Sequence, residues 1–145
     1  MKQAEICARL PHAGRMCLLE RLDTWDPETI VCWAVSHRAS DNPLRSGECL
    51  HAVCGVEYAA QAMALHGSLL ATPGSPPAIG YLASVRDLRL YVARLDDAGA
   101  ELRVEARRLH DSAGGFMYSF AVLADARPLL AGRAMVMLMN AQART

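Results

Sequence analysis

Hydrophobic positions divide the chain into one long apolar segment and several shorter alternating ones. Within residues 52–65, Glu57 and Gln61 are the only strongly polar side chains, and they stand four residues apart, on one face of a helix. A helix that is apolar on nearly every side is usually enclosed by other structure. The pattern therefore predicts a buried helix over residues 52–70, with a carboxylate and an amide inside its apolar shell.

Segments of strand character stand on both sides of this helix. The clearest is 102–107, where Leu102, Val104 and Ala106 alternate with charged side chains. In the first segment after the helix, Leu88, Leu90 and Val92 are expected on one face and Asp87, Arg89 and Tyr91 on the other. The predicted strands are residues 16–25, 29–35, 79–95, 102–107, 116–123 and 129–139.

The order of these elements predicts the fold class. Two strands, a long loop over residues 36–48, the buried helix and four further strands fit one antiparallel sheet wrapped around one central helix. This is an α+β hot-dog fold with five to six strands. No repeat or linker divides the chain, so residues 1–145 form a single domain. The run 134–139 is apolar at every position and needs cover on both faces, which dimerisation commonly provides in such a fold.

Composition narrows the class of partner. Fifteen basic residues balance fifteen acidic ones, which gives no reason to expect nucleic acid. No apolar run reaches the roughly 18 residues of a membrane span. Five cysteines without a C-x-x-C pair, and no signal peptide in residues 1–9, predict reduced thiols in a cytoplasmic protein.

Four motifs together resemble a known family. Leu10-Pro11-His12, the segment 16–22, the helix segment 55–62 and the glycine-led segment 80–86 are similar, in this order, to the β-hydroxyacyl-[acyl carrier protein] dehydratases. The resemblance is best to a divergent branch, the hot-dog 3-hydroxyacyl-carrier-protein dehydratases, which include the type encoded in aryl polyene biosynthesis clusters. It extends over about residues 8–138.

The resemblance implies an activity and a set of partners. The expected reaction is the reversible removal of water from 3-hydroxyacyl thioesters to give trans-2-enoyl thioesters, in fatty acyl or polyene biosynthesis. The substrate is carried on the 4'-phosphopantetheine of an acyl carrier protein, and neither a dissociable cofactor nor a metal is implied. Arg86, Arg89 and Arg94 are candidates for the carrier-protein surface, with a solvated strand face as the alternative. The protein is expected to be a homodimer, or a heterodimer with a related hot-dog subunit.

The resemblance also implies roles for individual residues. It places the catalytic acid at Glu57 and the thioester oxygen near the backbone amides at the start of the helix, where a helix N-terminus favours a developing anion. Gln61 is expected to hold the Glu57 carboxyl group. The implied substrate-binding residues are Ala52, Cys54, Gly55, Val56, Gln61, Gly80, Tyr81 and Leu82.

The histidine of the family motif is absent from its usual position. The familiar dehydratases carry it in a Gly-His-Phe setting before the acid, and the matching place here is Asn42-Pro43-Leu44. His37, on the same loop, is predicted to act as the second catalytic residue, and His51 at the helix entrance is the alternative within this chain. A related subunit that supplies the histidine is a further possibility.

Two other functions fit the same residues. A hot-dog acyl thioesterase would use Glu57 to activate water and would need no histidine, and a non-catalytic subunit would stabilise a His-bearing dehydratase. Glu57 would then be a dipole-stabilised carboxylate with a buried Arg partner, and Gln61 a satisfied buried amide. His66 and His110 are expected to be solvated.

Overall fold

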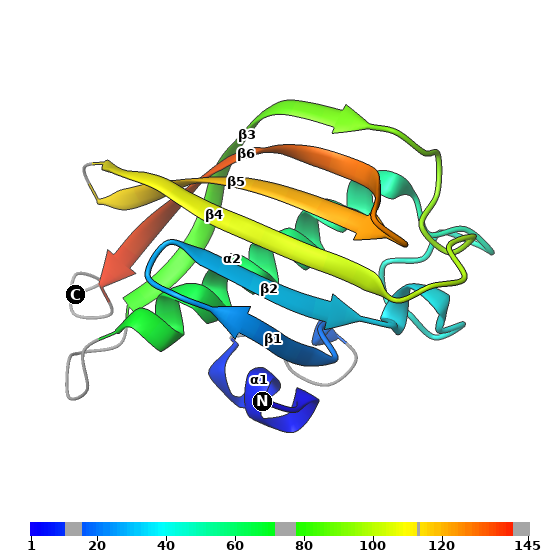
Figure 1. Ribbon diagram of the computed structural model, residues 1–145, viewed down its shortest axis with the longest axis horizontal. Coiled ribbons are helices and arrows are strands. Elements are labelled where there is room, and N and C mark those ends of the chain that lie inside the picture. Colours follow the sequence, from blue (N-terminus) through cyan, green and yellow to red (C-terminus); the bar gives the residue numbers. More distant parts are fainter. Residues whose placement is uncertain (11–15, 72–77, 113, 141–145) are drawn as a thin grey trace.

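The frame of the molecule is one curved antiparallel sheet (Figure 1). The computed structural model describes residues 1–10, 16–71, 78–112 and 114–140. The strands run in the spatial order β1-β2-β4-β5-β6-β3, and every neighbouring pair is antiparallel. They are β1 (Arg21–Trp25), β2 (Thr29–Ala34), β3 (Ala78–Leu90), β4 (Leu102–Ser112), β5 (Gly115–Ala124) and β6 (Arg127–Asn140).

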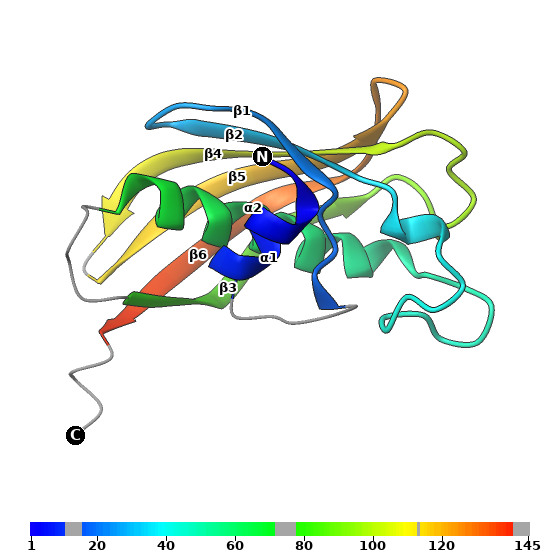
Figure 2. The same ribbon diagram turned by 90° about the horizontal axis from the view of Figure 1, so that it is seen from below.

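The long helix lies inside the curve of this sheet (Figure 2). Helix α2 (Gly55–Leu70) follows directly on a short 3-10 turn, η3 (Ala52–Cys54), so the helical stretch has the predicted bounds. It contacts β2, β4 and β5 from the middle of the sheet and β3 from its edge. The prediction of a hot-dog fold is confirmed.

Alternation along the central strands builds the core. Ile30, Cys32 and Ala34 of β2 are fully buried, and their neighbours in the strand are half-buried. In β4, Leu102 and Val104 are fully buried as well. Each large apolar side chain buried in this way contributes roughly 1.5–3 kcal/mol to the free energy of unfolding. The face that these side chains cover is the one that meets α2.

A β-bulge in β3 lies just before the predicted alternation of Leu88 and Leu90. The pairing of β3 with β6 shifts register between Arg86 and Arg89, and Asp87 has a positive φ of 53°. Beyond the bulge, Leu90 pairs with Leu130, a fully buried residue of β6, so Leu90 lies on the core-facing side of the sheet although it is 48% exposed. Leu88, two residues before it, is half-buried and packs against the core. The expectation that Leu88 and Leu90 share one face agrees with this register.

A short N-terminal helix was not predicted from the sequence. Helix α1 (Gln3–Arg9) packs on α2 and β1, with Ile6 fully buried, and it lies on the open side of the sheet (Figure 2). Cys7 of α1 forms a disulfide with Cys17. The prediction of reduced thiols is wrong for this pair, while Cys32, Cys49 and Cys54 are free.

Candidate active site

The start of α2 is fixed by the segment that follows β3. The Ala52 amide donates to the Ala93 carbonyl at 3.0 Å, and the Leu95 amide donates to the Leu50 carbonyl at 2.8 Å. The carboxylate of Asp96 accepts the Leu50 amide at 3.0 Å and is paired with the Arg94 guanidinium. These bonds hold the pKa of Asp96 far below its usual range, with Arg94 as the main cause. The helix entrance is thus held in place by backbone hydrogen bonds and by the Asp96–Arg94 ion pair.

Glu57 lies in the first turn of α2 and is half-buried. Its Oε1 accepts a hydrogen bond from Gln61 Nε2 at 3.4 Å. The partial positive charge of a helix N-terminus stabilises a carboxylate at this position. The predicted pair of a carboxylate and an amide four residues apart is therefore present on one face of the helix.

Gln61 is almost completely buried and binds the backbone of the N-terminal segment. Its Oε1 accepts the Leu18 amide at 2.9 Å, and its Nε2 donates to the Met16 carbonyl at 2.6 Å. These two bonds fix the orientation of the amide group. From the sequence, two roles stayed open for Gln61, a satisfied buried amide or a residue that holds the Glu57 carboxyl group. The structure shows both sets of contacts, because the Gln61 amide is satisfied by the backbone and also donates to Glu57.

A second buried polar group holds the loop before the helix. The Tyr58 hydroxyl lies 2.8 Å from Ser36 Oγ and accepts from Asn42 Nδ2 at 3.0 Å, while Asn42 Oδ1 accepts the Leu44 amide. Burial raises the pKa of Tyr58. By the resemblance, the position of the family's histidine falls on Asn42-Pro43-Leu44, and within this stretch the Asn42 side chain belongs to a structural clamp. The sequence signal for it was a tyrosine in an apolar helix, since a buried hydroxyl needs a partner.

His37, the predicted second catalytic residue, is fully buried in the turn η2 (Ser36–Arg38). Its Nε2 donates to the Ala98 carbonyl at 3.0 Å, and its Nδ1 has no hydrogen-bond partner among the described residues. Burial lowers the pKa of His37, against the opposing effect of the Ala98 carbonyl. The hydrogen bond recorded for His37 leads to the loop at residues 98–100, and its catalytic role stays a prediction.

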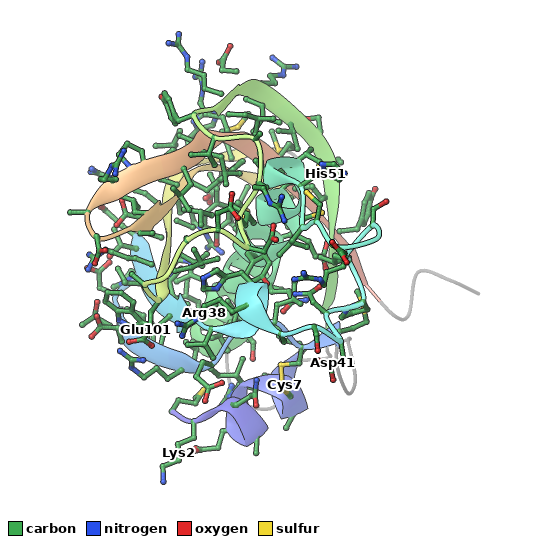
Figure 3. The ribbon with its side chains drawn as sticks, turned by 90° about the vertical axis from the view of Figure 1, so that its right-hand side faces the viewer. Lys2, Cys7, Arg38, Asp41, His51 and Glu101 are labelled. Atoms are coloured by element: carbon green, nitrogen blue, oxygen red, sulfur yellow. A yellow bond between two sulfur atoms is a disulfide. The ribbon has the colours of Figure 1, made fainter. Side chains whose placement is uncertain are left out.

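The other histidines occupy different places. His51 is exposed beside the start of α2 (Figure 3), with Nδ1 3.7 Å from Cys49 Sγ. His110 is exposed, as expected. His12, in the Leu-Pro-His motif, lies outside the described residues.

His66 is fully buried, so the expectation that it is solvated is wrong. Its Nε2 lies 2.7 Å from the Asp26 carbonyl, which only accepts, and its Nδ1 lies 2.7 Å from the Tyr118 hydroxyl. Nε2 therefore carries the proton, and Nδ1 accepts from Tyr118. Arg108 donates two hydrogen bonds to the same hydroxyl. This network satisfies His66 within the core and makes it a structural residue.

The predicted substrate-binding residues fall into two groups. Ala52, Cys54, Gly55, Val56 and Gln61 belong to the helix and its entrance, whereas Gly80, Tyr81 and Leu82 lie on β3. Tyr81 is 47% exposed and Leu82 is 37% exposed, because β3 is the edge strand of the sheet.

Three backbone amides at the helix entrance already have acceptors. Cys54 donates to the His51 carbonyl, Gly55 donates to the carbonyls of Ala52 and Val53, and Ala52 donates to Ala93. A thioester oxygen that used one of these three amides would require its bond to open or to be shared. The role of these amides in substrate binding stays a prediction.

Hollows on the surface of the described region include the following two. One of about 610 Å³ lies between residues 91–100 and the turn from β5 to β6, and one of about 400 Å³ lies over β2, β4 and β5. Glu57 lines neither of them. In the part of the chain that the structure describes, no cluster of three or more His, Cys, Asp or Glu side chains has the geometry to hold a metal ion. No helix among these residues is both long and apolar enough to cross a bilayer.

The model of the ApeP-like family, described as ApeP dehydratase, matches residues 4–144. Curated protein sequences yield no significant match.

Solved structures of similar fold include a dehydratase heterocomplex and thioesterases. The dehydratase heterocomplex ApeI:P from Xenorhabdus doucetiae contains a chain with a TM-score of 0.78 and 19% identity, over 94% of this chain and 92% of that one. A thioesterase family protein from Silicibacter pomeroyi gives a TM-score of 0.66 and 16% identity, over 94% and 95% of the two chains. AziG from S. sahachiroi gives 0.61 and 15%, over 86% and 93%. At these identities the likeness shows the fold alone.

Proposed function

Since the chain belongs to the ApeP-like dehydratase family, we propose that it is a subunit of a 3-hydroxyacyl-carrier-protein dehydratase and that it works together with a related hot-dog subunit. The reaction removes a proton from C2 and the hydroxyl group from C3 of a 3-hydroxyacyl thioester. Water leaves, and a trans double bond forms between the two carbons. The acyl group would arrive on the 4'-phosphopantetheine of an acyl carrier protein.

The observation that carries this proposal is the position of Glu57. Glu57 is half-buried in the first turn of an enclosed helix, and its carboxyl group accepts a hydrogen bond from Gln61, one turn further along. Gln61 is itself held at both ends of its amide by the backbone at Met16 and Leu18. A carboxyl group positioned in this way is suited to deliver a proton to the leaving hydroxyl group.

The second catalytic group is assigned to the partner subunit. His37 and His66 are both fully buried, and the hydrogen bonds recorded for them go to structural partners. The ApeI:P structure is, by its description, a heterocomplex of a dehydratase. A His-bearing partner would complete a site of which this chain supplies Glu57, and His37 remains the candidate within this chain.

The edge of the sheet offers a place for this partner. β3 has β6 as its neighbour on one side and ends the sheet on the other. Tyr81, Leu82 and Leu90 on β3 and Tyr91 just after it are large apolar side chains that are exposed in the single chain. An exposed apolar edge strand favours pairing with another chain. A partner strand there would cover these side chains and extend the sheet.

Carrier-protein binding has two candidate cations on the same strand. Arg86 and Arg89 are exposed on β3, whereas Arg94 is already paired with Asp96. We therefore place the phosphate of the pantetheine arm nearer to Arg86 and Arg89 than to Arg94.

The test is a dehydration assay on the chain with its partner subunit. A 3-hydroxyacyl pantetheine thioester is supplied, and the enoyl thioester is followed by ultraviolet absorbance and mass spectrometry. Glu57→Gln should lower kcat/KM by about 10²- to 10⁴-fold, the range for loss of a general acid, with an unchanged melting temperature. Glu48→Gln, at an exposed carboxylate near the same helix, should leave the rate unchanged.

Three results would contradict the proposal in different ways. Full activity of Glu57→Gln would make this chain a non-catalytic subunit. Free 3-hydroxy acid in place of enoyl thioester would identify a thioesterase. Full activity of the isolated chain would remove the need for a partner and would direct attention to His37, through the variant His37→Asn.

A further inference from the structure

The disulfide is connected to the candidate catalytic group, Glu57, by a short series of covalent and hydrogen bonds. Cys7 is on α1, where Figure 3 shows the disulfide, and Cys17 is in the segment that precedes β1. Cys17 is 4% exposed, while Cys7 is half-buried at the surface of α1. Cys7 is thus the more accessible side of the bond to a small dithiol.

The two residues that flank Cys17 are the ones that hold Gln61. The carbonyl of Met16 accepts from Gln61 Nε2 at 2.6 Å, and the amide of Leu18 donates to Gln61 Oε1 at 2.9 Å. The same Nε2 lies 3.4 Å from Glu57 Oε1. A continuous path of covalent and hydrogen bonds thus leads from the disulfide to the Glu57 carboxyl group.

Other contacts keep α1 in place when the disulfide is open. Ile6 is fully buried, Gln3 Nε2 donates to the Leu19 carbonyl at 3.2 Å, and the Leu22 amide donates to the Met1 carbonyl at 3.0 Å. Cleavage of the disulfide is therefore expected to leave the fold intact. It would remove the covalent restraint at Cys17, the residue between the two that bind Gln61, and so allow larger local motion at Met16 and Cys17, while the buried side chains of Leu18 and Leu19 stay in the core.

We infer that the Cys7–Cys17 disulfide is a redox-sensitive lock on the Gln61–Glu57 pair. In the oxidised form, the cross-link fixes Met16 and Leu18 and so orients Gln61 toward Glu57. A dithiol reductant gives two electrons to the bond, becomes a cyclic disulfide itself and leaves the thiols of Cys7 and Cys17. The segment then loosens, and the orientation of Glu57 is no longer fixed. This inference rests on the proposed function where it concerns activity, since it describes the regulation of the same site.

The first experiment reads the lock without catalysis. The side-chain amide resonances of Gln61 and the exchange of the Leu18 amide are followed by NMR before and after a dithiol is added. Reduction should shift the Gln61 signals and speed the exchange of Leu18, while the amides in the middle of α2 stay slow. Cys7→Ser should reproduce the reduced state and no longer respond to the dithiol. Cys49→Ser, at a half-buried free thiol, should respond as the unaltered protein does.

The second experiment measures dehydration by the chain with its partner subunit in both redox states. Reduction should lower kcat/KM by about 10- to 100-fold, the range for a catalytic group that loses its position, and Cys7→Ser should be low in both states. An equal response of the Cys7→Ser complex to the dithiol would show that the effect comes from the partner, and would overturn the inference.

The outcomes separate this inference from the proposed function. Unchanged Gln61 and Leu18 signals on reduction overturn the lock, whatever the activity. Changed signals with equal activity in the two states overturn its link to Glu57. Changed signals with no dehydration in either state contradict the proposed function and leave the lock itself supported.

Discussion

The contact between Gly55 and Leu130 allows a quantitative test of how closely α2 packs on the sheet. A Cβ atom added at Gly55 would lie 2.4 Å and 2.9 Å from the two methyl groups of Leu130. Leu130 is fully buried in β6, so its side chain has little room to turn away. Overpacking of this kind costs about 1–3 kcal/mol, and the gain in helix propensity from Gly to Ala is at most about 1 kcal/mol. Gly55→Ala should therefore lower the free energy of unfolding by up to about 2 kcal/mol.

The same helix provides a matched control with the opposite sign. Gly67 also lies in α2, and a Cβ atom added there would meet no heavy atom within 4 Å. Gly67→Ala should raise the free energy of unfolding by about 0.5–1 kcal/mol, because it removes backbone freedom from the unfolded chain. Two identical substitutions in one helix are thus expected to change stability in opposite directions.

Urea denaturation measures the free energy of unfolding of both variants, and thermal unfolding gives a second readout. For a chain of this size, each 1 kcal/mol shifts the melting temperature by about 2–4 °C, so the two variants should differ clearly. A double mutant tests whether the contact with Leu130 causes the loss. In a Leu130→Ala background, the Cβ at residue 55 has space, and the cost of Gly55→Ala should largely disappear. The reasoning is refuted if Gly55→Ala stabilises as Gly67→Ala does, or if its cost is the same in both backgrounds.

Two further predictions concern the buried histidines. Burial lowers the pKa of both His37 and His66 below that of the unfolded chain, so the unfolded state binds more protons as the pH falls below about 6.5. Stability should be greatest at neutral to mildly alkaline pH and should decrease between about pH 7 and pH 5; urea midpoints that stay constant or rise over this range would contradict it. Tyr118→Phe removes the donor to His66 and the acceptor for Arg108, and it should cost about 1–3 kcal/mol in the same assay, whereas no loss would mean that water replaces the hydroxyl group.

Much of the fold follows from the periodicity of the chain. The alternation of Leu102, Val104 and Ala106 and the apolar run over residues 52–70 are direct consequences of a sheet that encloses a helix. Helix α1 has no such signal, because seven residues are too few for a clear period and it is held by Ile6 and the disulfide. The bulge at Asp87 also escaped prediction, since one additional residue in a strand leaves its composition unchanged.

The candidate site divides in the same way. Glu57 and Gln61 could be found from the sequence because helix spacing alone places them on one face. The burial of His66 could not, since its partners Asp26 and Tyr118 lie 40 and 52 residues away in the sequence. The disulfide between Cys7 and Cys17 was missed because its formation depends on where α1 packs, and the spacing of the two cysteines in the sequence does not indicate that position.

The strand order also bears on how the chain is made. β3 is the first strand after α2, yet its neighbour in the sheet is β6, the last strand, which comprises residues 127–140. During synthesis, β3 therefore leaves the ribosome well before the strand that will pair with it, with Tyr81 and Leu82 uncovered. Folding of the nascent chain can be completed only after translation has passed β6, so chaperones have that interval in which to bind the uncovered strand.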